Sequence, residues 1–434
     1  MGSPKLLFRG ARVVDPAGGR DEVADVLVRD GAVADVGGGL DAASAEIVEC
    51  DGLVLAPGLV DMHTHLREPG FEQKETVETG TRAAAVGGYT AVAPMANTDP
   101  VADDASVIAE VRAAAARADL ADVFPVGAIT KGLEGEVLAE IGEMVEAGVR
   151  VFSDDGRCVP TARTLRNALT YARAFDDVVL ADHCEDASLS TGQQMHEGIS
   201  SYSLGLAGQP AAAEVSIVFR DIEMARLTGG RLHICHLSSA RSVELVRRAK
   251  ADGIRVSAEV TPHHLVFTDE DLRTYDTNLK VNPPLRSAED REALREGLAD
   301  GTIDAIATDH APHAVEEKEA EFDRAPHGTI GLETALAVAL TELVAPGLLD
   351  LSRALEALSC SPARLLGARD HGGPIAAGRP ANLVLFDPEE RWVVEPPFVS
   401  RSRNSAFMGR AMVGRVRHTV RHGMLMVSEG KATR

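Results

Sequence analysis

The chain has 434 residues, of which 45% are hydrophobic and 25% are charged. These values are ordinary for a globular protein, and the length is ample for a large core. The 66 acidic and 44 basic side chains give a formal net charge of −22, which argues against nucleic acid and anionic membranes as partners, because like charges repel.

The cysteines and the N-terminal sequence bear on the cellular compartment. Five cysteines lie without regular spacing and without a CxxC motif, which argues against a disulfide framework and is typical of a reducing compartment. The opening MGSPKLLFRGARVVD lacks the apolar core of a signal peptide, and no window approaches 18 uninterrupted apolar residues. We therefore expect a cytoplasmic protein without a membrane span.

The two ends of the chain share a strand-rich pattern. Residues 1–55 contain LLFRGARVVD, ADVLVRDGAVADVG and AEIVECDGLVLAPG, in which short apolar runs alternate with Gly and Asp turns. Residues 368–434 repeat this pattern in GRPANLVLFD, RWVVEPP and VGRVRHTVRHGMLMV. Because chain termini often lie close together, we expect the two segments to form one small β domain.

The segment between them, residues 56–367, contains eight apolar runs, each followed by a helix-like stretch, over roughly 56–345. Alternation of strand and helix predicts a parallel sheet, and eight units of this length indicate a (β/α)8 TIM barrel. An open doubly wound sheet is the structural alternative. A nucleotide-binding version of that sheet has no support, since no GxGxxG or GxxxxGK[ST] follows a strand.

Polar side chains end most of the predicted strands. They are His63 and His65, Asn97, Asp154 and Asp155, His183, His236, His263 and His264, and Asp309 and His310. In a barrel these strand ends meet on one face, where active sites of this fold are built. Each residue alone has an ordinary structural explanation, such as a turn for the Asp-Asp pair; their joint placement is what predicts a site.

The stretch VDMHTHLREPG places His63, His65 and Arg67 at alternate positions. If the strand extends that far, all three point to one face. The residues then form either a polar face at a sheet edge or a metal-binding pair beside an anion-binding arginine.

Four histidines and two aspartates at strand ends favour the metal. Imidazole and carboxylate together suit zinc and other divalent ions. Six such ligands exceed the needs of one tetrahedral zinc and suit two ions about 3.5–4 Å apart.

These residues lie in motifs that resemble the cyclic amidohydrolases, and most closely the dihydroorotase family of the long bacterial (class I) type. The matching segments are DMHTHLREPG, GTRAAAVGGYT, MANTDP, GAITKG, FSDDGR, DHCED, EVTPHH, NPPLR, TDHAPH and GLET, which cover nearly the whole barrel. MANTDP departs from the family's usual MPNT but keeps Asn97. The terminal segments fit the small composite β domain of that superfamily.

The resemblance implies two Zn²⁺ ions per chain. His63 and His65 would bind one ion together with Asp309, and His183 and His236 would bind the other. Many amidohydrolases bridge their metals with a carbamylated lysine, but VRVFSDDGRCVP contains no lysine. Asp155, at the position of the family's ligand, is therefore expected to bridge the two ions, and Asp154 to hold the turn.

The resemblance also implies the reaction, which is the reversible, zinc-dependent cyclisation of N-carbamoyl-L-aspartate to L-dihydroorotate and water in de novo pyrimidine (UMP) biosynthesis. Asp309 would be the catalytic acid–base. Arg67 would bind the substrate carboxylate, because guanidinium binds carboxylate bidentately. Further substrate contacts are expected from Asn97, Asn282, His313, Pro326, His327 and Gly328.

Several expectations concern the surroundings of the site. The charged, Gly- and Pro-containing segment 311–331 is either a lid over the substrate or a solvated loop. His263, His264 and His310 lie near the site, where hydrogen bonding to ligands is their expected role. His233 is expected to face away from His236.

Two alternative functions stay open. One is a dihydropyrimidinase, hydantoinase or allantoinase, although Arg67 with Asn97 favours a substrate that carries a carboxylate. The other is a non-catalytic scaffold for aspartate transcarbamoylase, although the chain keeps all six metal ligands. The family implies a homodimer and, in some members, a complex with that transcarbamoylase.

Overall fold

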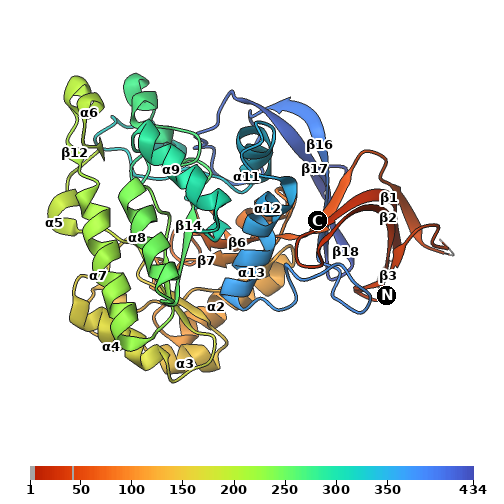
Figure 1. The fold of residues 1–434 in the computed structure, drawn as a ribbon, viewed down its shortest axis with the longest axis horizontal. Helices are drawn as coiled ribbons and strands as arrows, with labels where there is room; N and C mark the ends of the chain where they lie inside the picture. The colour runs from red at the N-terminus through yellow and green to blue at the C-terminus, as the bar shows by residue number, and fades with distance from the viewer. Residues whose placement is uncertain (1–4, 42–43) are drawn as a thin grey trace.

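The computed structural model describes residues 5–41 and 44–434, and a barrel and a separate β-sheet lie side by side in it (Figure 1). The barrel strands are β6 (Leu59–Thr64), β7 (Tyr89–Pro94), β8 (Asp122–Val123), β9 (Val151–Ser153), β10 (Val179–Asp182), β13 (Leu232–Ile234), β14 (Val256–Val260) and β15 (Ala305–Ile306). They pair in parallel as β6–β7–β8 and as β9–β10–β13–β14–β15.

Two parallel bridges join these two groups of strands into a closed ring. One links Gly127 with Phe152, and the other links Thr64 with His310. The predicted (β/α)8 barrel is thereby confirmed.

A helix follows each barrel strand and packs on the outside of the ring. In order these helices are α1 (Val77–Val86), α2 (Ala105–Ala118), α3 (Ile141–Glu146), α4 (Ala162–Ala172), α7 (Ala212–Thr228), α8 (Ala240–Ala251), α9 (Ala288–Ala299) and α11 (Ala335–Ala339). The last continues into a π-helical turn, Leu340–Val344, and α12 (Leu351–Leu355) and α13 (Ser361–Leu366) complete the barrel.

Side-chain caps fix where the helices begin. The Asp104 carboxylate accepts hydrogen bonds from the backbone N–H groups of Ser106 and Val107 at the start of α2. At the start of α9, Ser287 and Asp290 cap each other's backbone N–H groups. Both arrangements satisfy donors that a helix leaves free at its first turn.

The barrel contains short additional elements that the simple alternation in the sequence does not predict. Between β10 and α7 the chain inserts α5 (Ala187–Ser190), β11 (Met195–His196), α6 (Ile199–Leu204) and β12 (Gly208–Gln209). These elements are too short to produce a clear periodic pattern in the sequence.

The two ends of the chain form one mixed β-sheet. Its strands are β1 (Leu6–Asp15), β2 (Arg20–Arg29), β3 (Ala32–Gly37), β4 (Glu46–Glu49), β5 (Val54–Pro57), β16 (Leu383–Val393), β17 (Ala411–Arg421), β18 (Met424–Ser428) and β19 (Lys431–Ala432). The halves join where β5 pairs antiparallel with β16, from Leu383 opposite Pro57 to Phe386 opposite Val54. The expected composite β domain is confirmed.

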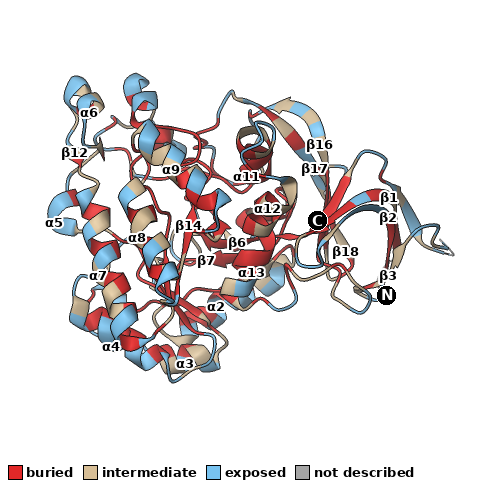
Figure 2. Ribbon diagram, in the orientation of Figure 1, coloured by how far each residue is buried: buried red, intermediate tan, exposed pale blue. Residues whose placement is uncertain are grey.

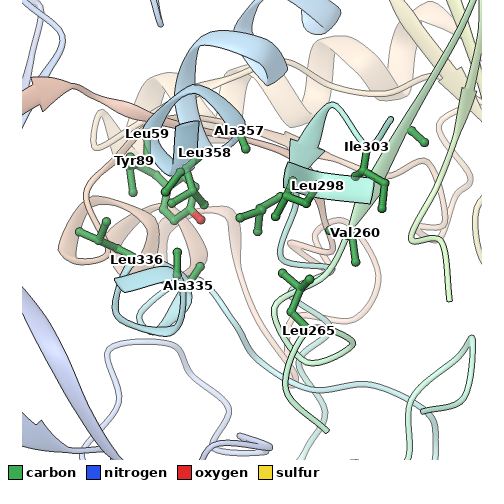
Figure 3. Close-up of a cluster of buried hydrophobic side chains, with 14 of the residues drawn as sticks. Leu59, Tyr89, Val260, Leu265, Leu298, Ile303, Ala335, Leu336, Ala357 and Leu358 are labelled. Atoms are coloured by element: carbon green, nitrogen blue, oxygen red, sulfur yellow. The ribbon is translucent and has the colours of Figure 1, made fainter. Parts of the chain in front are cut away.

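Burial follows from this architecture. All six residues of β6 and all six of β7 are buried, as expected for strands covered on both faces, and the helices expose only their outer faces (Figure 2). In the core, Leu59 and Tyr89 of the barrel lie near Leu336 and Leu358 of the surrounding helical segments (Figure 3). The strand ends that carry the candidate site are therefore anchored in a packed core.

The described part of the chain contains no helix that is both long and apolar enough to span a bilayer.

Candidate active site

The six predicted metal ligands gather at the carboxyl ends of the barrel strands. They come from β6 or directly after it (His63, His65), and from the residues that follow β9 (Asp155), β10 (His183), β13 (His236) and β15 (Asp309). All six are buried. The fold thus brings together residues that are up to 246 positions apart in the sequence.

The ligands form two groups of three, within each of which the ligating atoms lie no more than 4.8 Å apart. One group is His63, His65 and Asp309; the other is Asp155, His183 and His236. This division matches the two zinc positions that the family resemblance implies.

Asp155 lies between the two groups. Its Oδ1 is 3.4 Å from His63 Nε2, 3.4 Å from His236 Nε2 and 3.5 Å from His183 Nδ1. Its Oδ2 is 3.5 Å from His65 Nε2. One carboxylate therefore faces imidazoles of both groups, which is the arrangement that a bridging ligand requires. Asp154 instead accepts hydrogen bonds from the backbone N–H groups of Ile129 and Thr130.

Unpaired polar atoms at the centre of the site fit a metal ion. Among the described residues, His63 Nε2 and Asp155 Oδ1 are buried and lack a hydrogen-bond partner. Leaving such an atom unsatisfied costs about 1–3 kcal/mol, and a divalent cation would satisfy both. Four imidazoles and two carboxylates are ligand types that bind zinc and other divalent ions.

The electrostatics of the cluster favour added positive charge. Burial opposes protonation of His63, yet Asp155 and Glu259 raise the pKa of this imidazole well above its ordinary value. Burial likewise favours the neutral acid at Asp155, yet His63 and His183 hold the pKa of that carboxyl well below its usual range. Carboxylates that pull protons onto neighbouring imidazoles would equally attract a cation.

Glu259, which sequence reasoning missed, orients a ligand. Its Oε1 lies 2.6 Å from His63 Nδ1, so that His63 turns Nε2 toward the cluster. Its Oε2 is 3.2 Å from His233 Nε2, and His233 Nδ1 is 2.9 Å from Ser257 Oγ. The available signal was a lone acid in the buried strand sequence VSAEV, because an unpaired carboxylate is rarely buried there.

Of the other histidines near the site, His264 and His310 have structural partners, whereas His263 Nε2 is buried without a hydrogen-bond partner among the described residues. His264 bonds to Thr261 Oγ1 and to the carbonyl of Pro283. His310 lies 3.3 Å from Glu75 Oε2 and accepts the N–H of Gly331. Neither imidazole hydrogen-bonds to the side chain of a predicted metal ligand, but the backbone carbonyl of His310 accepts the N–H of His65 at 2.9 Å.

A cavity of about 330 Å³ opens above the cluster. Its wall contains every predicted substrate-binding residue, namely Arg67, Asn97, Asn282, His313, Pro326, His327 and Gly328. It also contains the predicted ligands except His63, which is fully buried.

Arg67 reaches this cavity in a way that strand alternation does not explain. Strand β6 ends at Thr64, and Arg67 adopts a left-handed backbone conformation with φ 63°. Its Nε donates to the carbonyl of Pro312 at 3.2 Å. Burial lowers the pKa of Arg67 to about 10, so the guanidinium stays charged at neutral pH. His236 and Asp309 also have positive φ.

The two asparagines of the cavity contact metal-ligand candidates. Asn97 Oδ1 lies 3.0 Å from His65 Nδ1, and Asn97 Nδ2 donates to the carbonyl of Asp155. Asn282 Nδ2 lies 3.2 Å from His183 Nε2. Each asparagine thus orients an imidazole in addition to facing the cavity.

His313 is held as a neutral imidazole. Burial, and then the positive charge of Arg67, lowers the pKa of His313 to about 2. Its Nε2 lies 2.9 Å from the carbonyl of His327 and therefore donates to it. This bond links the two stretches of segment 311–331 that line the cavity.

A second His–Asp group lies outside this site, at the junction of the barrel with the β domain. Asp122 Oδ2 is 2.8 Å from His371 Nε2 and 2.6 Å from His422 Nε2, and its Oδ1 accepts from Arg421. These distances are typical of ion pairs and are shorter than the distances around Asp155. The guanidinium of Arg421 already supplies a positive charge beside Asp122.

Comparisons with known proteins agree with this geometry. A family model described as "Dihydro-orotase-like" matches residues 52–242. The chain is 54% identical to a dihydroorotase of Streptomyces coelicolor over 99% of its own length and 100% of that protein's. It is 51% identical to a dihydroorotase of Pelotomaculum thermopropionicum over 98% and 99% of the two lengths.

Solved structures give the same fold. An L-hydantoinase (dihydropyrimidinase) from Arthrobacter aurescens superimposes with a TM-score of 0.88 at 27% identity, covering 100% of this chain and 98% of that one. A dihydropyrimidinase from Brevibacillus agri gives a TM-score of 0.87 at 24% identity, covering 99% and 96%. With half of its residues shared with curated relatives over their full length, the chain belongs to the dihydroorotase family.

Proposed function

We propose that this protein is a dihydroorotase that reversibly closes N-carbamoyl-L-aspartate to L-dihydroorotate and water, a step of pyrimidine biosynthesis. The single observation that carries this proposal is the charged guanidinium of Arg67 in the wall of the same cavity as two groups of metal-ligand candidates. L-Dihydroorotate carries a carboxylate beside a cyclic amide, and this cavity offers a partner for each.

We propose two Zn²⁺ ions as the cofactors. His63, His65 and Asp309 would hold one ion, and His183 and His236 the other, with Asp155 shared. Bound zinc would lower the pKa of water and polarise the amide carbonyl. Glu259 and Asn97 would keep the imidazoles of His63 and His65 turned toward the ions.

Asp309 is the proposed acid–base residue. Burial favours its neutral form, but the hydrogen bond from His65 and the nearby imidazoles lower the pKa of Asp309 to about 2, so the carboxylate is available as a proton acceptor at neutral pH. In the hydrolytic direction it would take a proton from the attacking water and pass it to the ring nitrogen as the C–N bond breaks. Cyclisation would use the same steps in reverse.

Arg67 would bind the substrate carboxylate, assisted by Asn97, Asn282 and His313. The stretch 326–328 would close the opposite wall. In this structure the N–H of Gly328 donates to the carbonyl of Lys280 at 2.8 Å, so this N–H is already used within the protein. Closure of segment 311–331 as a lid stays a prediction.

We further propose that the protein works in the cytoplasm as a homodimer, with a complex with aspartate transcarbamoylase as a further expectation. All five cysteines are free thiols, which is typical of a reducing compartment. The two assembly proposals rest on the family resemblance.

The experiment that tests the function is turnover of L-dihydroorotate by the zinc-loaded chain, with dihydrouracil and hydantoin assayed in parallel. Turnover of L-dihydroorotate alone supports the proposal. Turnover of the uncharged rings instead would contradict the role of Arg67 and favour a hydantoinase. If all three substrates stay intact, even with aspartate transcarbamoylase added, the chain is not the proposed enzyme.

A further inference from the structure

Asn404 contacts the backbone of three residues that line the active-site cavity, and it does so from outside the barrel. It lies in the connection between β16 and β17, and its side chain is buried at 4% exposure. It does not line the cavity itself. Its side chain hydrogen-bonds to the backbone of Ala311, His313 and Gly328 in segment 311–331, and these three residues line the cavity.

The amide of Asn404 bridges two stretches of that segment. Its Nδ2 donates to the carbonyl of Ala311 at 3.0 Å and to that of Gly328 at 3.1 Å. Its Oδ1 accepts the N–H of His313 at 3.1 Å. Both donors and the acceptor of one side chain are therefore used on backbone groups next to the cavity.

These stretches approach each other closely. Gly328 has φ 139°, and a Cβ placed there would lie 2.8 Å from Ala311 Cβ and 3.0 Å from His313 Nε2. Small displacements would therefore change the cavity wall. The bridging amide of Asn404 links the two stretches at this close approach.

Lys318 holds the same carbonyl from the other side. Its buried Nζ donates to Gly328 O at 2.8 Å and to Pro326 O at 2.9 Å. The carbonyl of Gly328 thus accepts from two side chains, one within the segment and one from the β16–β17 connection.

We propose that Asn404 is a positioning residue of this active site, which holds residues 311–313 and 326–328 at the separation that substrate binding requires. This inference rests on the proposed function for its substrate. A group that only stabilised the fold would not need all three of its hydrogen bonds on cavity-lining backbone.

The test compares Asn404→Ala with Asn382→Ala. Asn382 is a matched control, since it is equally buried, and its amide also bridges two backbone groups, Asp370 O and His422 N, but in the β domain. We expect Asn404→Ala to raise KM for L-dihydroorotate about tenfold with unchanged zinc content. We expect Asn382→Ala to lower Tm and leave KM as in the wild type.

Hydrogen–deuterium exchange supplies a readout that does not depend on activity. In Asn404→Ala, amides of 311–331 should exchange roughly tenfold faster, with the barrel strands unchanged. Asn404→Asp keeps the volume and the acceptor but loses both donors, and it should act in the same direction if the alanine variant does not fold. Unchanged exchange and KM in the Asn404 variants would overturn the proposal, as would an equal rise of KM in Asn382→Ala.

A double variant tests the shared carbonyl. If Asn404 and Lys318 act through Gly328, the KM effects of Asn404→Ala and Lys318→Met should be clearly non-additive. Strict additivity would contradict a common target. Inactivity of the wild type toward L-dihydroorotate would overturn the proposed function, while the exchange comparison would still decide the role of Asn404.

Discussion

Glu259 Oε1 lies 2.6 Å from His63 Nδ1, and both side chains are buried in the barrel. This contact fixes which imidazole nitrogen faces the neighbouring carboxylates of Asp155 and Asp309. Because a ligand must present its lone pair in one direction, the contact ties metal affinity to a residue that does not itself bind the metal.

We therefore expect Glu259→Gln to weaken zinc binding roughly 10–100-fold. The amide keeps the size of the side chain but removes the negative charge that orients His63. Competition with a chromophoric chelator measures the affinity. Glu333→Gln is the matched control, since Glu333 is a carboxylate that accepts backbone N–H groups of Val399 and Ser400. Equal zinc affinity in the two variants would contradict this role of Glu259.

Arg67→Gln should lower kcat/KM for L-dihydroorotate about ten- to hundredfold, because a hydrogen bond to a charged group contributes about 1.5–3 kcal/mol. Zinc content should not change, since Arg67 is not a ligand candidate. Arg157→Gln is the control: Arg157 donates to the carbonyl of Leu133 and does not line the cavity. Steady-state kinetics measure kcat/KM of both variants. An equal loss of kcat/KM in both would contradict a specific role of Arg67 and point to general electrostatics.

Much of this site was predictable because it sits at the ends of buried strands. Apolar runs mark the strands, and the polar residue that ends each run marks the active-site face of a barrel. His183 directly follows β10, and His236 lies two residues after the end of β13. Apolar patterning alone did not separate Asp155 from Asp154, since both follow β9. The family motif selected Asp155, and the fold places its carboxylate beside the imidazoles of His63 and His236.

The other features of the site could not be predicted, because they depend on tertiary contacts that leave no local pattern in the sequence. Arg67 enters the cavity through a left-handed backbone rather than through strand alternation. Glu259 appears in the sequence as one acid in a strand, and its partner His63 is 196 positions away. Asn404 comes from a connection in the β domain, where no periodicity indicates a role in the barrel.

Asp309→Asn should reduce kcat by roughly 10²–10⁴-fold, the usual contribution of a general acid–base group. The amide cannot accept the proton, while the fold and the zinc of the Asp155 group should persist. Asp154→Asn is the matched control, because Asp154 holds the backbone of Ile129 and Thr130; it should lower Tm with a much smaller effect on kcat. Near-wild-type kcat in Asp309→Asn would exclude Asp309 as the acid–base residue.

His422 links the β domain to the barrel through Asp122, at 2.6 Å. The hydrogen bond to Asp122 raises the pKa of His422 above its ordinary 6.5. A raised pKa stabilises the fold fully below pH 6.5, and this stabilisation is lost as pH rises through the folded-state value.

His422→Gln should therefore lower Tm at pH 6 by roughly 1–2 °C, since solvent screens this part-exposed pair, and by less at pH 8.5. His418 offers the contrast, because burial lowers the pKa of His418. A group with a lowered pKa destabilises the fold as pH falls. The decrease in Tm caused by His418→Gln should therefore be smaller at pH 6 than at pH 8.5. Equal losses at both pH values for His422→Gln, measured by calorimetry, would show that the pair with Asp122 carries no charge-dependent stability.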